Sequence, residues 1–180
     1  MKTMDTNFTG LKILEPIVHG DDRGYFTESF KALHFPDHTF IQDNESKSAK
    51  NVLRGLHFQL PPYSQTKLIR VIFGEILDVV VDLRHDSPTF GLPYSIVLND
   101  SNRLQLLVPK GFAHGFLVLS DSAVVSYKVD APYSPEHDRG IVYNDPVLNI
   151  KWNNLENVVL SQKDRELPYF DPTAFSRIHW

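Results

Sequence analysis

Short runs of apolar and β-branched residues recur along the chain, and turn-forming residues separate them. The clearest runs are KLIRVIF (67–73), EILDVVVDL (75–83), YSIVL (94–98), LQLLVP (104–109), AHGFLVL (113–119) and AVVSYKV (123–129). Turn signals lie between them at LPPYS, FGE, HDSPTFG, NDSN and PKG. Short strands joined by tight turns form antiparallel hairpins. The pattern therefore predicts an all-β fold, either a sandwich or a barrel.

The two ends of the chain depart from this pattern. After about residue 145 the alternation stops, and helix-start signals at Ser161 and Asp171 predict one or two short helices packed on the barrel. Near the N-terminus, the segment 20–30 contains the alternating piece GYFTESF, which predicts a strand at a sheet edge. An exposed edge strand needs a partner, and that partner can be another subunit. The chain lacks βαβ alternation and a glycine-rich nucleotide loop, and we expect one domain over residues 1–180.

Composition narrows the classes of function. The net charge of −4 provides no overall basic field for nucleic acid or a membrane surface, so an anionic ligand requires a local cluster of Arg and Lys. Cysteine is absent, which excludes disulfides, thiolate metal sites and a cysteine nucleophile. The first residues lack the features of a signal peptide, and no apolar run approaches the ~20 residues that span a bilayer. We therefore expect a cytoplasmic protein.

A histidine interrupts the strand-like segment LRGLHFQ (53–59). Strict alternation places His57 on the same face as Leu53 and Gly55, whereas a bulge at Gly55 would bring Arg54 to that face. A structural, hydrogen-bonded histidine explains such a position as well as a catalytic one does. As a catalyst, a histidine that titrates near neutrality can abstract or deliver a proton.

Lys67 and His114 also lie on apolar strand faces. Lys67 shares its face with Ile69, and its ammonium group must either extend to water or meet a partner. A functional alternative is a cation that stabilises negative charge developing on a carbonyl oxygen. His114 shares its face with Phe116 and, taken alone, fits a buried structural histidine. A second inward-facing histidine in one barrel favours a functional cavity.

Two further residues have both a structural and a chemical interpretation. Tyr133 lies between Pro132 and Pro135, in a segment too rigid for a regular strand, so it either anchors the loop or presents a fixed hydroxyl group. Asp164 follows Ser161 at the spacing of a helix N-cap, which explains it as a capping residue. Asp164 could instead hold a histidine in one tautomer and raise its basicity.

A metal site is not expected. Small barrels that bind iron or zinc place two or three His or carboxylate ligands together, typically as HxH followed by Glu. This chain has Phe58 and Gln59 after its histidine and contains no HxH motif. The sequence therefore argues against a metal-dependent oxygenase of the same fold, and stoichiometric iron or zinc in the purified protein would revive that alternative.

Taken together, the motifs resemble the dTDP-4-dehydrorhamnose 3,5-epimerases, a branch of the cupin superfamily. The resemblance covers, in order, DDRGYFTESF, FIQDNESKS, VLRGLHFQ, QTKLIRVIFGEILDVVVDLR, SPTFG, VPKGFAHGFLVLS, YKVDAPYSPEHDRGI, YNDP and LSQKD. It implies a jelly-roll β-barrel that works as a homodimer without metal or other cofactor. The implied substrate is dTDP-4-dehydro-6-deoxy-D-glucose, which is inverted at C3 and C5 to give dTDP-4-dehydro-L-rhamnose.

The resemblance also implies catalytic roles. The protons on C3 and C5 flank the C4 ketone, so that removing either one gives an enolate. By resemblance, His57 is the base, Asp164 orients it, Tyr133 returns the proton on the other face and Lys67 faces the C4 oxygen. Further positions match residues that hold the substrate: Arg54, Gln42, Asn44 and His114 in the pocket, Arg23, Phe26 and Glu28 on an N-terminal strand that can reach a neighbour's site, and Glu136 and Lys163.

The chain departs from the family pattern at two positions. Phe58 stands where many members carry Tyr, and Glu45 where many carry His, and we expect either change to adjust the fit of the sugar without abolishing activity. Relatives that epimerise only C3, and ketoisomerases of the same fold, retain much of the same residue set. A catalytically silent sugar-nucleotide-binding cupin is the alternative from another class.

Overall fold

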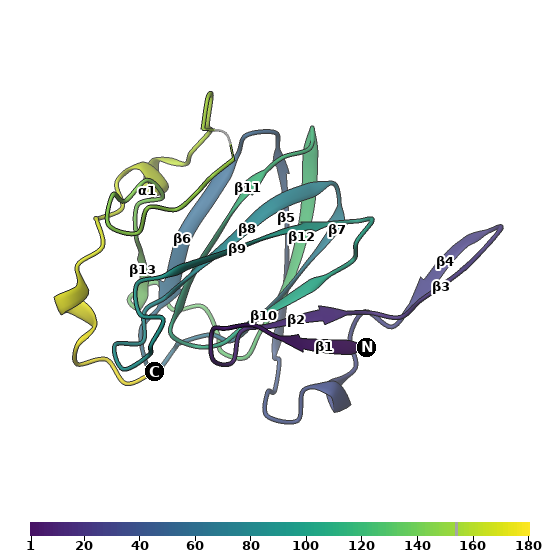
Figure 1. The fold of residues 1–180 in the computed structure, drawn as a ribbon, viewed down its shortest axis with the longest axis horizontal. Coiled ribbons are helices and arrows are strands. Elements are labelled where there is room, and N and C mark those ends of the chain that lie inside the picture. The colour runs from purple at the N-terminus through teal and green to yellow at the C-terminus, as the bar shows by residue number, and fades with distance from the viewer. Residues whose placement is uncertain (154) are drawn as a thin grey trace.

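Two large antiparallel β-sheets pack face to face in the computed structural model, which describes residues 1–153 and 155–180 (Figure 1). One sheet has six strands in the order β1-β2-β10-β7-β12-β5, and the other has five in the order β13-β6-β11-β8-β9. Strands β3 and β4 form a separate hairpin. The predicted all-β jelly roll is therefore confirmed.

The strands follow the apolar runs of the sequence closely. Their bounds are β1 Lys2–Asp5, β2 Lys12–Glu15, β3 Val18–Asp21, β4 Gly24–Thr27, β5 Gln42–Ala49, β6 Leu53–Gln59, β7 Lys67–Phe73, β8 Glu75–Asp82, β9 Pro93–Asn99, β10 Gln105–Val108, β11 Phe112–Val118, β12 Ser122–Val129 and β13 Asp138–Gly140. Each of the six predicted runs forms a strand. Strands β1, β2, β3, β5 and β13 were not predicted. The longest of them, β5, was missed because its sequence, QDNESKSA, is polar and mostly exposed.

Apolar side chains pack on both faces of the five-stranded sheet. Between the two sheets lies a core that includes Ile69, Val80 and Leu106. On the opposite face, Leu117 of β11 packs in a second cluster with Trp152 from the C-terminal tail. Strands β8 and β11 therefore carry apolar residues on both of their faces. Each fully buried side chain of this kind stabilises the fold by roughly 1.5–3 kcal/mol.

The C-terminal tail contains the two short helices that were predicted. Helix α1 (Gln162–Arg165) begins after Ser161, whose side chain accepts a hydrogen bond from the backbone of Asp164. The 3₁₀ helix η2 (Pro172–Phe175) begins after Asp171, which caps it in the same way. In the described part of the chain, no helix is long and apolar enough to cross a membrane.

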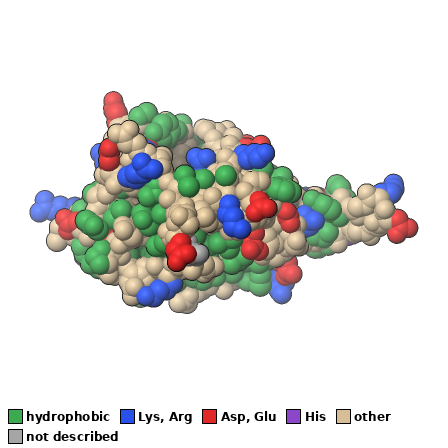
Figure 2. All heavy atoms as spheres, turned by 90° about the horizontal axis from the view of Figure 1, so that it is seen from above, with side chains coloured by type: hydrophobic (Ala, Val, Ile, Leu, Met, Phe, Trp, Pro, Cys, Tyr) green, Lys and Arg blue, Asp and Glu red, His purple; other side chains and the backbone are tan. Residues whose placement is uncertain are grey.

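The β3–β4 hairpin projects from the body as a narrow arm (Figure 1). Charged side chains lie at the end of this arm (Figure 2). Tyr25 and Phe26 are more than half exposed on it. In the described residues, β4 pairs with β3 alone and not with the edge of a large sheet. At the base of the arm, the Arg103 guanidinium lies over the Tyr25 ring at 3.6 Å. The short 3₁₀ helix η1 (Ala32–His34) follows the arm.

Candidate active site

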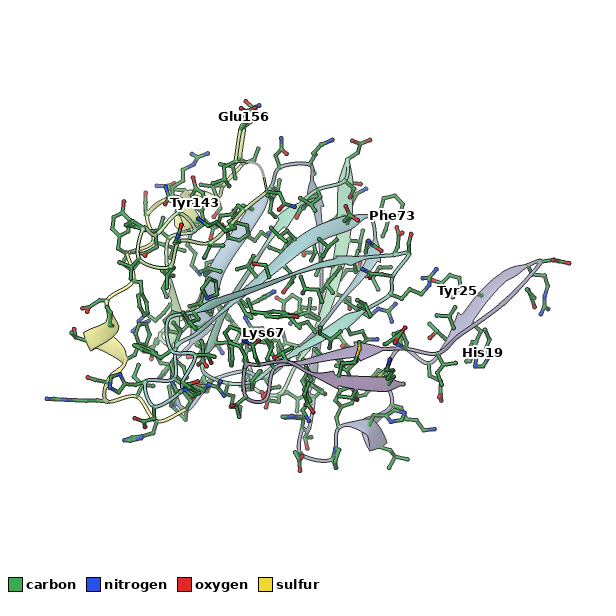
Figure 3. All side chains as sticks on the ribbon, in the orientation of Figure 1. His19, Tyr25, Lys67, Phe73, Tyr143 and Glu156 are labelled. Atoms are coloured by element: carbon green, nitrogen blue, oxygen red, sulfur yellow. The ribbon has the colours of Figure 1, made fainter. Side chains whose placement is uncertain are left out.

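A cavity of about 230 Å³ opens between the sheets, and Lys67 lies inside the body of the molecule at this place (Figure 3). Four of the candidate site residues line it together. The lining consists of Ser46, Arg54, His57, Lys67, His114, Gly115, Phe116 and Tyr127. These residues come from β5, β6, β7, β11 and β12, so both sheets contribute to the cavity.

A bulge in β6 brings Arg54 into this set. In the β6–β11 pairing, His57 lies opposite His114 and Arg54 lies opposite Phe116. Three residue steps of β6 thus match two steps of β11, and the extra residue falls beside Gly55. The bulge that would turn Arg54 toward the cavity is present.

Glycine is required at the bulge for two reasons. Gly55 has a φ of 113°, a backbone conformation that side chains disfavour, and a Cβ there would lie 2.7 Å from the Cα of Gly115. Beyond the bulge, Leu53 turns to the second apolar cluster, so the prediction from strict alternation that Leu53 shares a face with His57 is wrong. Arg54 Nε donates to Ser48 Oγ at 3.0 Å, which steadies the guanidinium at the cavity.

His57 and Asp164 form a close ionisable pair at the cavity. The imidazole Nε2 lies 2.7 Å from Asp164 Oδ1, and Ser161 Oγ donates to the other carboxylate oxygen at 2.7 Å. Burial acts to raise the pKa of Asp164, but the contacts with His57 and Ser161 outweigh it and hold that pKa below its usual value. The buried Nδ1 of His57 has no hydrogen-bond partner among the described residues. Asp164 therefore contacts the histidine and also belongs to the capped first turn of α1.

His114 forms a second pair with a carboxylate that sequence reasoning missed. Its Nε2 lies 2.8 Å from Oδ2 of Asp78, which is completely buried in β8. The other Asp78 oxygen has no hydrogen-bond partner in the described residues. The sequence did contain a signal for this pair, namely an aspartate in the middle of the apolar run EILDVVVDL. A carboxylate buried in such a run needs a partner.

The Lys67 ammonium faces the cavity without a hydrogen bond or ion pair from the described residues. Burial lowers the pKa of Lys67 to about 8, while the negative charges of Asp138 and Asp78 act to raise it. Lys67 is therefore mainly cationic near neutral pH and loses its charge in mildly alkaline solution.

Tyr133 does not line the cavity and is instead 57% exposed on the loop before β13. Its hydroxyl group donates to Asp138 Oδ2 at 2.9 Å, and Lys163 pairs with the same oxygen. The hydrogen bond to Asp138 raises the pKa of Tyr133. Asp138 was also missed from the sequence. It lies on β13 two residues from Gly140, the register partner of His57, so Tyr133 is hydrogen-bonded to the strand that pairs with the strand of His57.

Other candidate binding residues lie outside this cavity. Gln42 Nε2 donates to Asn44 Oδ1 at 2.8 Å on β5, and the Glu136 carbonyl accepts a hydrogen bond from Arg139. The remaining candidates, Arg23, Phe26 and Glu28, belong to the projecting arm or the segment directly after it, and all three are exposed. Within one chain, the arm residues are not brought to the cavity.

The two departures from the family pattern do not line the cavity. Phe58 packs in the second apolar cluster, where its ring lies 6.0 Å from that of Trp180. Glu45 lines a hollow of about 340 Å³ on the outer face of the six-stranded sheet, together with Arg70 and Lys128. Neither side chain faces the cavity, and the expectation that these residues adjust the fit of the sugar stays a prediction.

The ionisable groups of the cavity are of the kinds that transfer protons. It holds two imidazole groups, each against a buried carboxylate, and one ammonium group. Over the described residues, no group of three or more His, Asp or Glu side chains could hold a metal ion. The fold and the cavity together define a class, the cupin-like jelly rolls with a cavity of ionisable side chains between their sheets.

Comparison with known proteins identifies the family. The family model for dTDP-4-dehydrorhamnose 3,5-epimerase matches residues 5–172, and the chain belongs to this family of sugar-nucleotide isomerases. The chain is 48% identical to the dTDP-4-dehydrorhamnose 3,5-epimerase of Escherichia coli K12, over 93% of either chain.

Solved structures of relatives have the same fold. The Bacillus anthracis epimerase, with TDP and PPi bound, has a TM-score of 0.89 and 52% identity, covering 94% of this chain and 99% of that one. The Legionella pneumophila enzyme, in complex with dTDP-4-keto-L-rhamnose, has a TM-score of 0.88 and 43% identity, covering 94% and 98%.

Proposed function

We propose that this epimerase inverts C3 and C5 of dTDP-4-dehydro-6-deoxy-D-glucose, giving dTDP-4-dehydro-L-rhamnose, with His57 as base and Tyr133 as acid. The observation that carries the proposal is the His57–Asp164 pair in one cavity with the Lys67 ammonium. The Legionella relative, solved with the keto-rhamnose product, supports the choice of substrate class.

The first step removes a proton from the carbon next to the ketone. His57 takes the proton from C3 or C5, and the electron pair of the broken C–H bond moves through the new C=C bond onto the C4 oxygen. Asp164 stabilises the imidazolium that forms. Lys67 stabilises the enolate oxygen. A positioned base typically contributes 10²–10⁴-fold to the rate, and an oxyanion donor roughly 10²–10³-fold.

The second step returns a proton to the opposite face. The Tyr133 hydroxyl protonates the carbon as the C4 ketone re-forms, and the phenolate then regains a proton from solvent, while His57 releases the proton it took. The hydrogen bond from Tyr133 to Asp138 supports this assignment because Asp138 lies on β13, the strand that pairs with the strand of His57. Substrate binding must replace this hydrogen bond with a contact to the sugar.

The nucleotide must lie largely outside the cavity. Sites for whole small molecules commonly measure about 300–1,000 Å³, and the cavity of about 230 Å³ suits the sugar ring alone. We propose that His114 and Arg54 hold the sugar and its first phosphate, and that Gln42, Asn44, Glu136 and Lys163 contribute at the rim. The pairing of His114 with buried Asp78 supports a fixed donor at this place.

A second copy of the chain would complete the site. Arg23 and Phe26 lie on the projecting arm, with Tyr25 and His19, far from Lys67 (Figure 3). A guanidinium suits a diphosphate, and an aromatic ring stacks on a base. We therefore propose a homodimer in which the arm of each protomer binds the nucleotide over the partner's cavity. The exposure of Phe26 supports this arrangement.

Solvent-isotope exchange tests the reaction. The purified enzyme is incubated with dTDP-4-dehydro-6-deoxyglucose in D₂O, and deuterium is located by NMR. Label at both C3 and C5 of an inverted product is expected. Label at C3 alone would assign a single epimerase, and nucleotide binding without any exchange would assign a silent binding protein. His57→Ala should abolish exchange at both carbons while nucleotide binding is kept.

A further inference from the structure

Gln59 is a polar side chain that the proposed reaction does not use, although it is only 5% exposed. It ends β6, two residues after His57, and lies opposite Asp138 in the β6–β13 pairing. Along a strand, residues two apart share a face, so Gln59 lies on the same side of the sheet as His57. A buried amide in this place must have its hydrogen bonds satisfied.

The Gln59 amide binds the backbone on both sides of Tyr133. Its Oε1 accepts from the N–H of Ser134 at 2.7 Å, and its Nε2 donates to the carbonyl of Pro132 at 3.1 Å. The two groups belong to the peptide units immediately before and after Tyr133. The second N–H bond of Nε2 reaches the carbonyl of Tyr63 at 2.7 Å, which joins a second loop to the same strand.

Other hydrogen bonds of this loop hold Ser134 to His137 and Asp138, and none of them joins the two peptide units of Tyr133 to a sheet. Pro132, Tyr133 and Pro135 are all exposed, so packing does not immobilise them. The segment between β12 and β13 is not part of either sheet. The two hydrogen bonds from Gln59 to Pro132 and Ser134 therefore fix the Tyr133 backbone from the inside. The hydrogen bond to Asp138 fixes the hydroxyl end of the Tyr133 side chain.

We infer that Gln59 is a positioning residue for the acid, an inference that rests on the proposed role of Tyr133. Through one rigid strand it fixes the distance between the base at His57 and the backbone that carries the phenol. A displacement of about 1 Å can lower the rate of a positioned step by 10²-fold. Gln59 thereby decides how often the enolate is protonated with inversion instead of by return from His57.

The measured quantity is a partition ratio. It is the amount of deuterium at C3 and C5 of the recovered substrate, divided by the amount of inverted product. Exchange without inversion requires the base, whereas inversion also requires the acid. Gln59→Leu keeps a similar volume and removes the three hydrogen bonds. It should raise the ratio by about ten- to a hundredfold. A purely structural residue would lower exchange and inversion together and leave the ratio unchanged.

Gln65→Leu is the matched control. Gln65 Nε2 also holds this loop, but it donates to the carbonyl of Ala131 at 2.8 Å, outside the two peptide units of Tyr133. Its substitution should leave the ratio near that of the unaltered enzyme. An equal rise in Gln59→Leu and Gln65→Leu, or no rise in Gln59→Leu, would overturn the inference.

Two further variants keep the result interpretable. If Gln59→Leu does not fold, Gln59→Glu keeps the acceptor for Ser134 and loses both donors, and it should give a smaller rise; an unchanged ratio would overturn the inference. Tyr133→Phe should raise the ratio by itself, and adding Gln59→Leu to it should change the ratio no further. An unchanged ratio in Tyr133→Phe would contradict the role of Tyr133 as the acid, and the inference about Gln59 would fall with it. A higher ratio in Tyr133→Phe but not in the Gln59 variants would contradict only the inference about Gln59.

Discussion

Nε2 of His57 lies 2.7 Å from Oδ1 of Asp164, although His57 belongs to a central strand and Asp164 to a short helix of the C-terminal tail. The tail crosses the outer face of the five-stranded sheet and covers its apolar side chains. The hydrophobic burial that holds the tail therefore also delivers the carboxylate to the histidine. Ser161 fixes that carboxylate by capping the helix and by donating to its second oxygen.

Replacing Asp164 tests this contact. Asp164→Asn should lower the rate of exchange at both carbons by about 10²–10⁴-fold, because the imidazolium loses its charge partner and the tautomer is no longer held. As a control, Ser161→Ala removes the cap and should lower the free energy of unfolding by about 1 kcal/mol while keeping most of the exchange. Equal losses of exchange in the two variants would contradict the pairing role.

The alkaline limb of the pH profile should report Lys67. Because burial lowers the pKa of this ammonium to about 8, the cation is present below that pH and is lost above it. We expect kcat/KM for epimerisation to fall above about pH 8. Lys67→Arg should move the fall to higher pH, since a guanidinium keeps its charge. A limb that stays in place in Lys67→Arg would assign it to another group.

Asp138 should also affect the pH at which kcat/KM falls on the alkaline side. Its negative charge raises the pKa of Lys67, so Asp138→Asn should move the alkaline limb to lower pH, opposite to the shift in Lys67→Arg. Asp43→Asn removes an acid of the same charge that pairs with Lys128, and it serves as the control. The pH dependence of kcat/KM in the three proteins provides the test, and a common shift in both variants would contradict a local effect.

The bulge at Gly55 should be intolerant of any side chain. Gly55→Ala should lower the free energy of unfolding by about 1–3 kcal/mol or more, since φ is positive and the new Cβ would collide with the neighbouring strand. Gly20→Ala is the control, because its added Cβ would lie 3.7 Å from the nearest atom. Denaturant unfolding measures both variants. Similar stability of Gly55→Ala and Gly20→Ala would show that the bulge can relax.

Mixed dimers should reveal a shared site. If the arm of one protomer serves its partner's cavity, a dimer of one His57→Ala chain and one Phe26→Ala chain contains one intact site and one with both defects. Such dimers should recover about half of the unaltered activity per dimer, although neither parent variant is active at limiting substrate. Mixed dimers without any recovery would place the arm on the cavity of its own chain.

The sequence by itself determined the six strands of the apolar runs, the capped tail helices and the inward face of His57 and Lys67. These features are local, because the two-residue period of a strand and the hydrogen bonds of a cap depend on neighbouring residues. The quoted motifs also identified the family, which the comparison confirmed. The position of Leu53 was predicted wrongly from strict alternation because a bulge resets the period.

Only the tertiary structure decided which side chains meet. The pairing of β8 with β11 places buried Asp78 against His114, and the β6–β13 pairing places Asp138 near the base. The fold likewise brings the Gln59 side chain into hydrogen-bond contact with Ser134 of the Tyr133 loop. Such contacts depend on strand register and on the path of the chain between distant segments. An isolated aspartate or glutamine in a strand therefore shows that a partner is needed, but only the folded chain supplies the partner.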